Sequence, residues 1–214
     1  MSCMTDHVRF YRKPFQIIRA NLRAFLVINA IVFGLFIAGL VAAMIFPELG
    51  ATKSAASEAS GEFDFARSLL ENPWLLALVI LAVNIFTAAG LWIILPSLIV
   101  PFAAIPLFAY KAFTLGSGLF PTTELAAVGW IPHSLTALIE FEAYSLLVFG
   151  AYILGRSWLR PATIGARNRR QGYLRGLRQF GWLGLAALAL FIVGAVWEAY
   201  SLRYLVHPLS ELLL

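Results

Sequence analysis

The chain has 214 residues, of which 61% are hydrophobic and only 13% are charged. Because a soluble globular domain carries about 25% charged residues, this composition excludes an ordinary water-soluble fold. The formal net charge is +5, and the single cysteine excludes an intrachain disulfide.

Two long uncharged stretches indicate an integral membrane protein. Residues 24–46 and 74–110 contain no Asp, Glu, Lys or Arg, and a membrane-spanning helix needs about 20 apolar residues. As one helix the second stretch would be about 55 Å long, whereas the hydrocarbon core of a bilayer is about 30 Å thick. This stretch must therefore turn back on itself. Pro96 and Pro101 mark the turn, because proline removes a helical N–H and clashes with the preceding turn of helix.

The expected fold is therefore all-α, a polytopic transmembrane helix bundle of about five spans in one domain, 24–205. Pro96, Pro101 and Pro106 follow one another at five-residue intervals, so we expect the third span to be kinked or partly unwound. The spans expected from the apolar runs are about 24–46, 74–95, 97–119, 132–155 and 180–204.

Charges between the expected spans predict the orientation. Residues 1–23 carry five Lys or Arg and one Asp, and residues 156–179 carry seven arginines and no acid. The loop 47–73 carries two basic and five acidic residues. Basic loops stay in the cytoplasm, so we expect a cytoplasmic basic N-terminal segment, 1–23, and an external C-terminal tail, 206–214.

The arginine-rich loop is expected to set the topology and to touch anionic lipid, with a dedicated partner site as the alternative. No nucleic-acid partner is expected, because the positive-inside bias accounts for the charge. The arginines are Arg156, Arg160, Arg167, Arg169, Arg170, Arg175 and Arg178.

Sequence motifs of common catalytic and metal sites are absent. The chain has no H-E-x-x-H, no G-x-x-x-x-G-K-[ST], no G-x-S-x-G and no Cys/His cluster with metal-ligand spacing. We therefore expect no enzymatic activity, no catalytic residue, no metal and no cofactor.

Five polar residues fall at similar depth in the expected spans. Counted from the outer ends of the spans, the ionisable ones lie about 9 to 15 Å deep. A charge in hydrocarbon costs several kcal/mol, so these groups should face the bundle interior and pair, or line water. The layer consists of Lys111, Glu140, Glu142, Glu198 and Asn84.

Helical spacing limits which of these residues meet. Glu140 and Glu142 are two residues apart and therefore about 200° apart around a helix, so they point to different sides. His133 shares a face with Glu140 but lies about 10 Å from it along the axis, at the start of the fourth span and outside the layer. We expect Lys111 to neutralise one glutamate. The layer serves either structural pairing or a proton- or ion-linked function.

On the first span, the small residues Gly39 and Ala43 permit a close helix contact.

Several short motifs, in this order, resemble the stage II sporulation protein M family of integral membrane proteins. The likeness covers roughly residues 15–205. The motifs are VNIFTAAG with Asn84, the pair Leu115–Gly116, IPHS at 131–134, GRSWLRPATIGAR, and WEAY at 197–200.

Matches and departures are both visible against the family pattern. Lys111 and Ala112 stand where the family has Asn and Gly, Ser134 replaces a Gly, and Ala137 occupies the position of a Glu. The family-motif residues that match are Asn84, Gly116, Pro132, His133 and Glu198.

The resemblance implies a multi-pass protein of a prokaryotic cell membrane that has no established enzymatic activity and assembles with membrane-anchored partners. We therefore expect a non-enzymatic component or scaffold of a membrane assembly. Its expected partners are the lipid bilayer and either other membrane proteins or further copies of the chain. The alternative is a permease-like protein with a proton- or solute-coupled intramembrane site, because broken helices and midplane polar groups are transporter features.

Overall fold

The described part of the chain is helical and has no β-strand, which confirms the all-α prediction. The computed structural model describes residues 12–59, 61–121 and 123–214; Arg9 and the rest of 1–11, part of the predicted basic segment, lie outside them. The helices are α1 (Lys13–Ala20), α2 (Leu22–Ile45), α3 (Glu48–Ala59), α4 (Glu62–Leu69), α5 (Pro73–Ala82), η2 (Val83–Ile94), α6 (Leu95–Ile99), α7 (Ala104–Leu119), α8 (Glu124–Leu159), η3 (Pro161–Ile164), α9 (Arg169–Tyr204) and α10 (Val206–Leu213).

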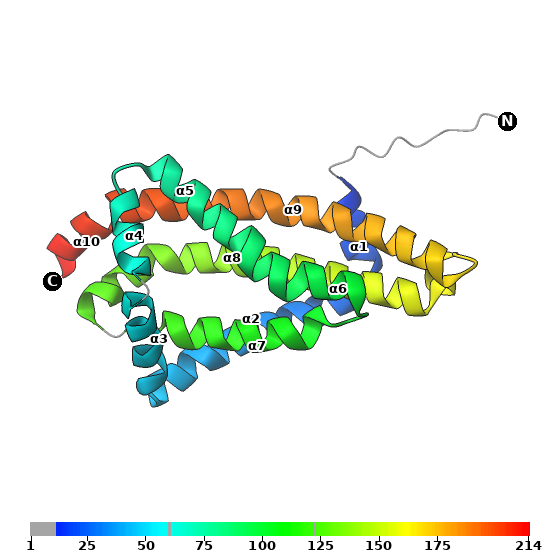
Figure 1. The fold of residues 1–214 in the computed structure, drawn as a ribbon, viewed down its shortest axis with the longest axis horizontal. Coiled ribbons are helices and arrows are strands. Elements are labelled where there is room, and N and C mark those ends of the chain that lie inside the picture. Colours follow the sequence, from blue (N-terminus) through cyan, green and yellow to red (C-terminus); the bar gives the residue numbers. More distant parts are fainter. Residues whose placement is uncertain (1–11, 60, 122) are drawn as a thin grey trace.

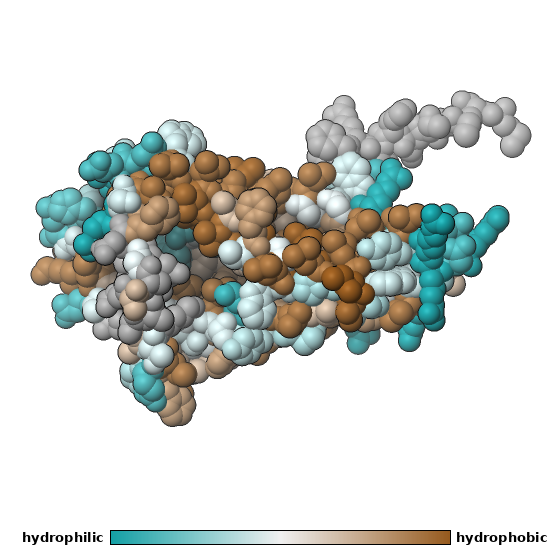
Figure 2. Space-filling model, viewed as in Figure 1, coloured by the Kyte–Doolittle hydropathy of each residue, from teal (hydrophilic) through white to brown (hydrophobic). Residues whose placement is uncertain are grey.

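The long helices run along the long axis of the molecule (Figure 1). Within the described ranges, four helices are long and apolar enough to cross a membrane: Leu22–Ile45, Pro73–Ile99, Glu124–Leu159 and Arg169–Tyr204. The second combines α5, η2 and α6. The surface over the middle of the molecule is largely hydrophobic, and hydrophilic residues gather at its two ends (Figure 2). These features fit a transmembrane protein.

Two helices begin earlier than predicted, because side chains cap them. The Thr123 side chain accepts a hydrogen bond from the backbone N–H of Ala126 (3.1 Å), so α8 begins at Glu124 and Pro132 lies inside it. The Asn168 side chain accepts from the N–H of Gln171 (2.9 Å). Such caps satisfy the free N–H groups of a first turn. Much of the predicted arginine loop is therefore helical.

The turn inside the long apolar stretch contains Pro101, the second of the two prolines that predicted it. Pro96 stands in the first turn of α6, and the chain turns over residues 100–103. Phe102 adopts the left-handed region there, with φ of 65°. Its ring lies 5.9 Å from that of Tyr152. Pro106 falls in the first turn of α7, where its missing N–H has no intrahelical partner to lose. The predicted third span is thus divided between α6 and α7.

α8 lies at the centre of the bundle and is the most buried of the four candidate spans. It packs along α9 and also contacts α2, α7 and η2. Large side chains buried around it include Phe108, Phe149 and Phe191. In Figure 1, α3, α4 and α10 gather at one end of the bundle, whereas α1 and the α8–α9 hairpin lie toward the other.

α2 and α7 approach each other through glycine. A Cβ built on Gly39 would lie 2.8 Å from the backbone nitrogen of Ser117 and 3.1 Å from the Cα of Gly116. A Cβ on Gly116 would meet the backbone of Phe36. Small residues permit such close backbone contact between membrane helices. The predicted close contact at Gly39 is therefore made within the chain.

Substitution of Gly39 tests this contact. Gly39→Ala is expected to lower the free energy of unfolding by about 1–3 kcal/mol, because the added methyl group forces the two backbones apart. Gly34→Ala on the same helix is the control, since a Cβ there meets nothing within 4 Å. Chemical unfolding in detergent measures both variants. Equal stability of the two would contradict the packing described.

Candidate functional site

A cavity of about 220 Å³ lies among η2, α7, α8 and α9 and contains four of the five residues of the predicted polar layer. Figure 2 shows hydrophilic residues in a recess of this face, below a hydrophobic band and above paler residues. The polar side chains that line the cavity are Asn84, Thr87, Lys111, His133, Glu140, Tyr144 and Glu198.

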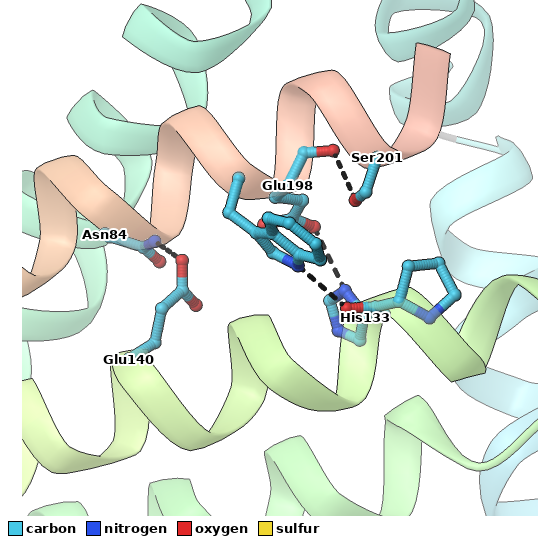
Figure 3. A network of polar contacts seen from close by, with 7 residues as sticks. Asn84, His133, Glu140, Glu198 and Ser201 are labelled. Atoms are coloured by element: carbon cyan, nitrogen blue, oxygen red, sulfur yellow. Dashed lines mark hydrogen bonds and ion pairs between the residues drawn. The ribbon is translucent and has the colours of Figure 1, made fainter. Parts of the chain in front are cut away.

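Asn84 joins η2 to the central helix. Its amide nitrogen donates a hydrogen bond to Glu140 Oε1, and its amide oxygen accepts one from the Tyr144 hydroxyl (2.8 Å). Figure 3 shows Glu140 pointing from α8 toward Asn84. Tyr144 is buried, with 2% of its surface exposed. Both ends of the Asn84 amide are therefore occupied, which holds the Glu140 carboxyl against η2.

Asn84 is the second residue of a π-helical segment, η2. The Thr87 hydroxyl, one turn further on, donates to the carbonyl oxygen of Val83. π-Helical turns are rare, and they frequently occur at functional sites because they change which side chains face a neighbouring helix. In this chain the segment directs Asn84 to α8.

His133 also belongs to the cavity. Its Nδ1 lies 3.2 Å from Glu198 Oε1 on α9, and Figure 3 shows the two side chains meeting between the helices. The neighbouring Trp197 donates from Nε1 to the carbonyl oxygen of Pro132 (3.1 Å). The expectation that His133 lies outside the polar layer is wrong. The reason is that α8 begins two turns before Pro132, so His133 lies within the bundle and faces α9.

Lys111 reaches the cavity from α7 without an ion pair. Its Nζ lies 5.5 Å from the centre of the Trp92 ring, a position in which a cation is attracted to the face of an aromatic ring. Among the residues that the structure describes, the ion pairs are His133–Glu198 and His207–Glu211. The expected ion pair between Lys111 and a glutamate is therefore not formed.

Glu142 lies on another side of α8, as its 200° separation from Glu140 predicts. It lines an outer groove of about 640 Å³ between α1, α8 and α9. The other residues of this groove are apolar: Pro14, Phe15, Ile18, Leu146, Trp182, Leu185, Ala186, Ala189 and Leu190. The polar layer predicted from depth therefore divides into an inner set and one outer carboxyl group.

Room for Glu140 comes from a glycine on the facing helix. A Cβ built on Gly194 of α9 would lie 3.2 Å from Glu140 Cγ and 3.7 Å from its Oε1. A larger residue at position 194 would press on the carboxyl group and displace it from Asn84. Gly194 therefore positions Glu140.

Three of the five family-motif residues line the cavity, namely Asn84, His133 and Glu198. Pro132 contributes its carbonyl oxygen to Trp197. Gly116 instead packs against α2. Sequence reasoning missed Tyr144 and Trp197. Tyr144 follows Glu140 by four residues, a spacing that places both on one helix face and was a usable signal.

The predicted arginines lie at the end of the bundle where α8 and α9 are joined. Arg156 is on α8, Arg160 follows it, and Arg167 precedes α9. The Arg175 side chain donates to the carbonyl oxygen of Ile164 (2.9 Å) and so closes the hairpin. The remaining arginines are all on α9: Arg169, Arg170 and Arg178.

The inner set combines two carboxyl groups, an imidazole and an ammonium group in a small space. Carboxyl groups and imidazole exchange protons, and the Asn84 and Tyr144 dipoles fix the orientation of one carboxyl. Such a set of groups is chemically able to bind a small polar or charged species. In the described ranges, no three His, Cys, Asp or Glu side chains gather as a metal site requires.

Comparisons with protein-family models, with curated proteins and with solved structures found no match to this chain.

Asn84 offers a test of the network. Asn84→Ala is expected to lower the free energy of unfolding by about 1 kcal/mol, because two interhelical hydrogen bonds of about 0.6 kcal/mol each are lost. Asn29→Ala is the matched control, since the Asn29 amide, within the described ranges, donates to the carbonyl oxygen of Phe25 in its own helix. Unfolding in detergent measures both. A loss for Asn29→Ala as large as that for Asn84→Ala would contradict the network.

Proposed function

We propose that the protein is a permease-like membrane protein in which the inner cavity binds protons or a small polar solute. One observation carries the proposal: the ionisable side chains of Lys111, Glu140, Glu198 and His133 line one cavity inside the bundle. Ionisable side chains inside a membrane bundle are costly, and they mark solute and proton pathways. The assignment implies no enzymatic step.

The topology that goes with this proposal has five spans in a prokaryotic plasma membrane, with a cytoplasmic N-terminus and an external C-terminus. α7 has 16 residues and covers about 24 Å, so it would cross most of the hydrocarbon core beside α2. The Arg156 side chain donates a hydrogen bond to Asn21 Oδ1 (2.7 Å). This contact supports placing the basic N-terminal segment and the arginine-rich loop on the same side of the membrane.

The charges of the cavity suit reversible binding. Lys111 has an aromatic neighbour and no carboxylate within ion-pair distance among the described residues. Its charge is therefore available to an anionic group of a solute, or balances the carboxyl groups across the cavity. Glu140 and Glu198 offer two acceptors for a cation or a proton. A site with both signs of charge favours a small zwitterion or a coupled proton over a large apolar ligand.

Flux measurements test this function. The protein, reconstituted into liposomes that enclose a pH-sensitive dye, is expected to conduct protons under an imposed gradient. Glu140→Gln is expected to abolish this flux, because it removes the titratable group beside Asn84. Glu142→Gln is the matched control: it makes the same chemical change two residues away, on the side of α8 that faces the outer groove. The proposal fails if wild-type liposomes conduct no more than empty ones, or if both variants lose flux equally.

A second candidate function, a scaffold in a membrane assembly, is favoured by Glu142. This carboxyl lies in an apolar groove, and no hydrogen bond or ion pair of Glu142 occurs among the described residues. A carboxyl group at this depth is stabilised by a partner helix that donates a hydrogen bond to it. The resemblance to the stage II sporulation protein M family suggests the same role.

The same two variants separate the candidates. Affinity purification in mild detergent followed by mass spectrometry is expected to recover a membrane partner with the wild-type protein and with Glu140→Gln. Glu142→Gln, or more severely Glu142→Leu, is expected to lose it. Recovery of the same proteins with all variants, or of none with the wild type, would contradict the scaffold function.

A further inference from the structure

A second groove lies at the basic end of the bundle, away from the polar cavity. It has a volume of about 550 Å³ and is formed by the break between α1 and α2, the start of α7 and the end of α8. Two arginines, Arg23 and Arg156, line it together with Asn21 and Tyr152, and no acidic residue does so. The groove is therefore positively charged at one end.

Arg156 is held in place with hydrogen-bonding capacity to spare. Its Nη2 donates to Asn21 Oδ1 (2.7 Å), and its guanidinium carbon lies 5.7 Å from the centre of the Tyr152 ring. A guanidinium has five N–H donors, and the bond to Asn21 occupies only part of them. Arginine binds phosphate oxygens through such charge-assisted hydrogen bonds.

The rest of the groove is apolar. Val27 and Ile31 follow Arg23 at intervals of four residues, so the three side chains share one face of α2 over about 12 Å along its axis. Val27 and Ile31 are 51% and 39% exposed, and Ile28 and Ile105 lie beside them in the lining. One wall thus runs from a pair of cations into the apolar middle of the molecule.

We propose that this groove is a specific site for an anionic phospholipid. The phosphate group binds to Arg23 and Arg156, and an acyl chain lies along Val27 and Ile31. A lipid is assigned rather than a free phosphate, because a free anion would leave the adjoining apolar wall uncovered. The site is independent of the polar cavity and of the function proposed for it.

Native mass spectrometry of the delipidated full chain in mild detergent tests the proposal. When the two lipids are added back, dioleoylphosphatidylglycerol is expected to bind as one molecule per chain. Dioleoylphosphatidylcholine is expected to bind more weakly. Arg156→Gln and Arg23→Gln are each expected to weaken binding of the anionic lipid about tenfold. Val27→Trp is expected to weaken it with both arginines intact, because the indole occupies the path of the acyl chain.

Arg160→Gln is the matched control, because Arg160 is an exposed arginine of the same hairpin that does not line the groove. It is expected to bind the lipid as the wild type does. If Arg156→Gln does not fold, the variants Arg23→Gln and Val27→Trp still test lipid binding, because both of these residues are exposed. Equal retention of the two lipids overturns the proposal. So does an equal loss of lipid binding in Arg160→Gln, or binding of glycerol phosphate as strong as that of the anionic lipid.

Discussion

The hydrogen bonds of Asn84 are the interaction on which the arrangement of this bundle depends. They join a π-helical segment to the central helix α8, through Glu140 on one side of the amide and Tyr144 on the other. In a lipid environment an unpaired amide or carboxyl group is costly, so the rotation of both helices is constrained until these groups meet. Packing of the apolar side chains alone leaves that rotation much freer, since lipid tails are as apolar as leucine.

The two glutamates of α8 show how one helix serves two surfaces. Glu140 faces the inner cavity, where Asn84 and the space left by Gly194 hold it. Glu142 faces an outer groove whose remaining lining is apolar. A permease-like site and a contact for a partner helix are therefore compatible in one molecule, and each depends on a different carboxyl group. A helix that carried both glutamates on one face would have offered only one of these surfaces.

At the basic end of the bundle, contacts between helices hold arginine side chains in place. Arg156 contacts Asn21 at the break between α1 and α2, and the hairpin behind it is closed by Arg175. These contacts hold positive charge beside an apolar groove. Arginine is suited to this position because its planar group is always charged and stacks on aromatic rings. The charge that predicts membrane orientation therefore also lines the groove proposed as a lipid site.

Composition and periodicity determined the all-α fold, the apolar helices and the opposite directions of Glu140 and Glu142, because hydropathy and helical spacing are local properties of the chain. Depth counting also placed Lys111, Asn84, Glu140 and Glu198 together, since residues at equal depth in neighbouring helices meet if they face inward. Only the tertiary structure decided that His133 pairs with Glu198 and that Lys111 lies against Trp92. It also decided that α8 begins at Glu124 and that the chain turns at Pro101, while Pro96 remains inside a helix. These features depend on caps and on the rotation of each helix about its axis, which neighbouring helices impose and a single apolar segment does not encode.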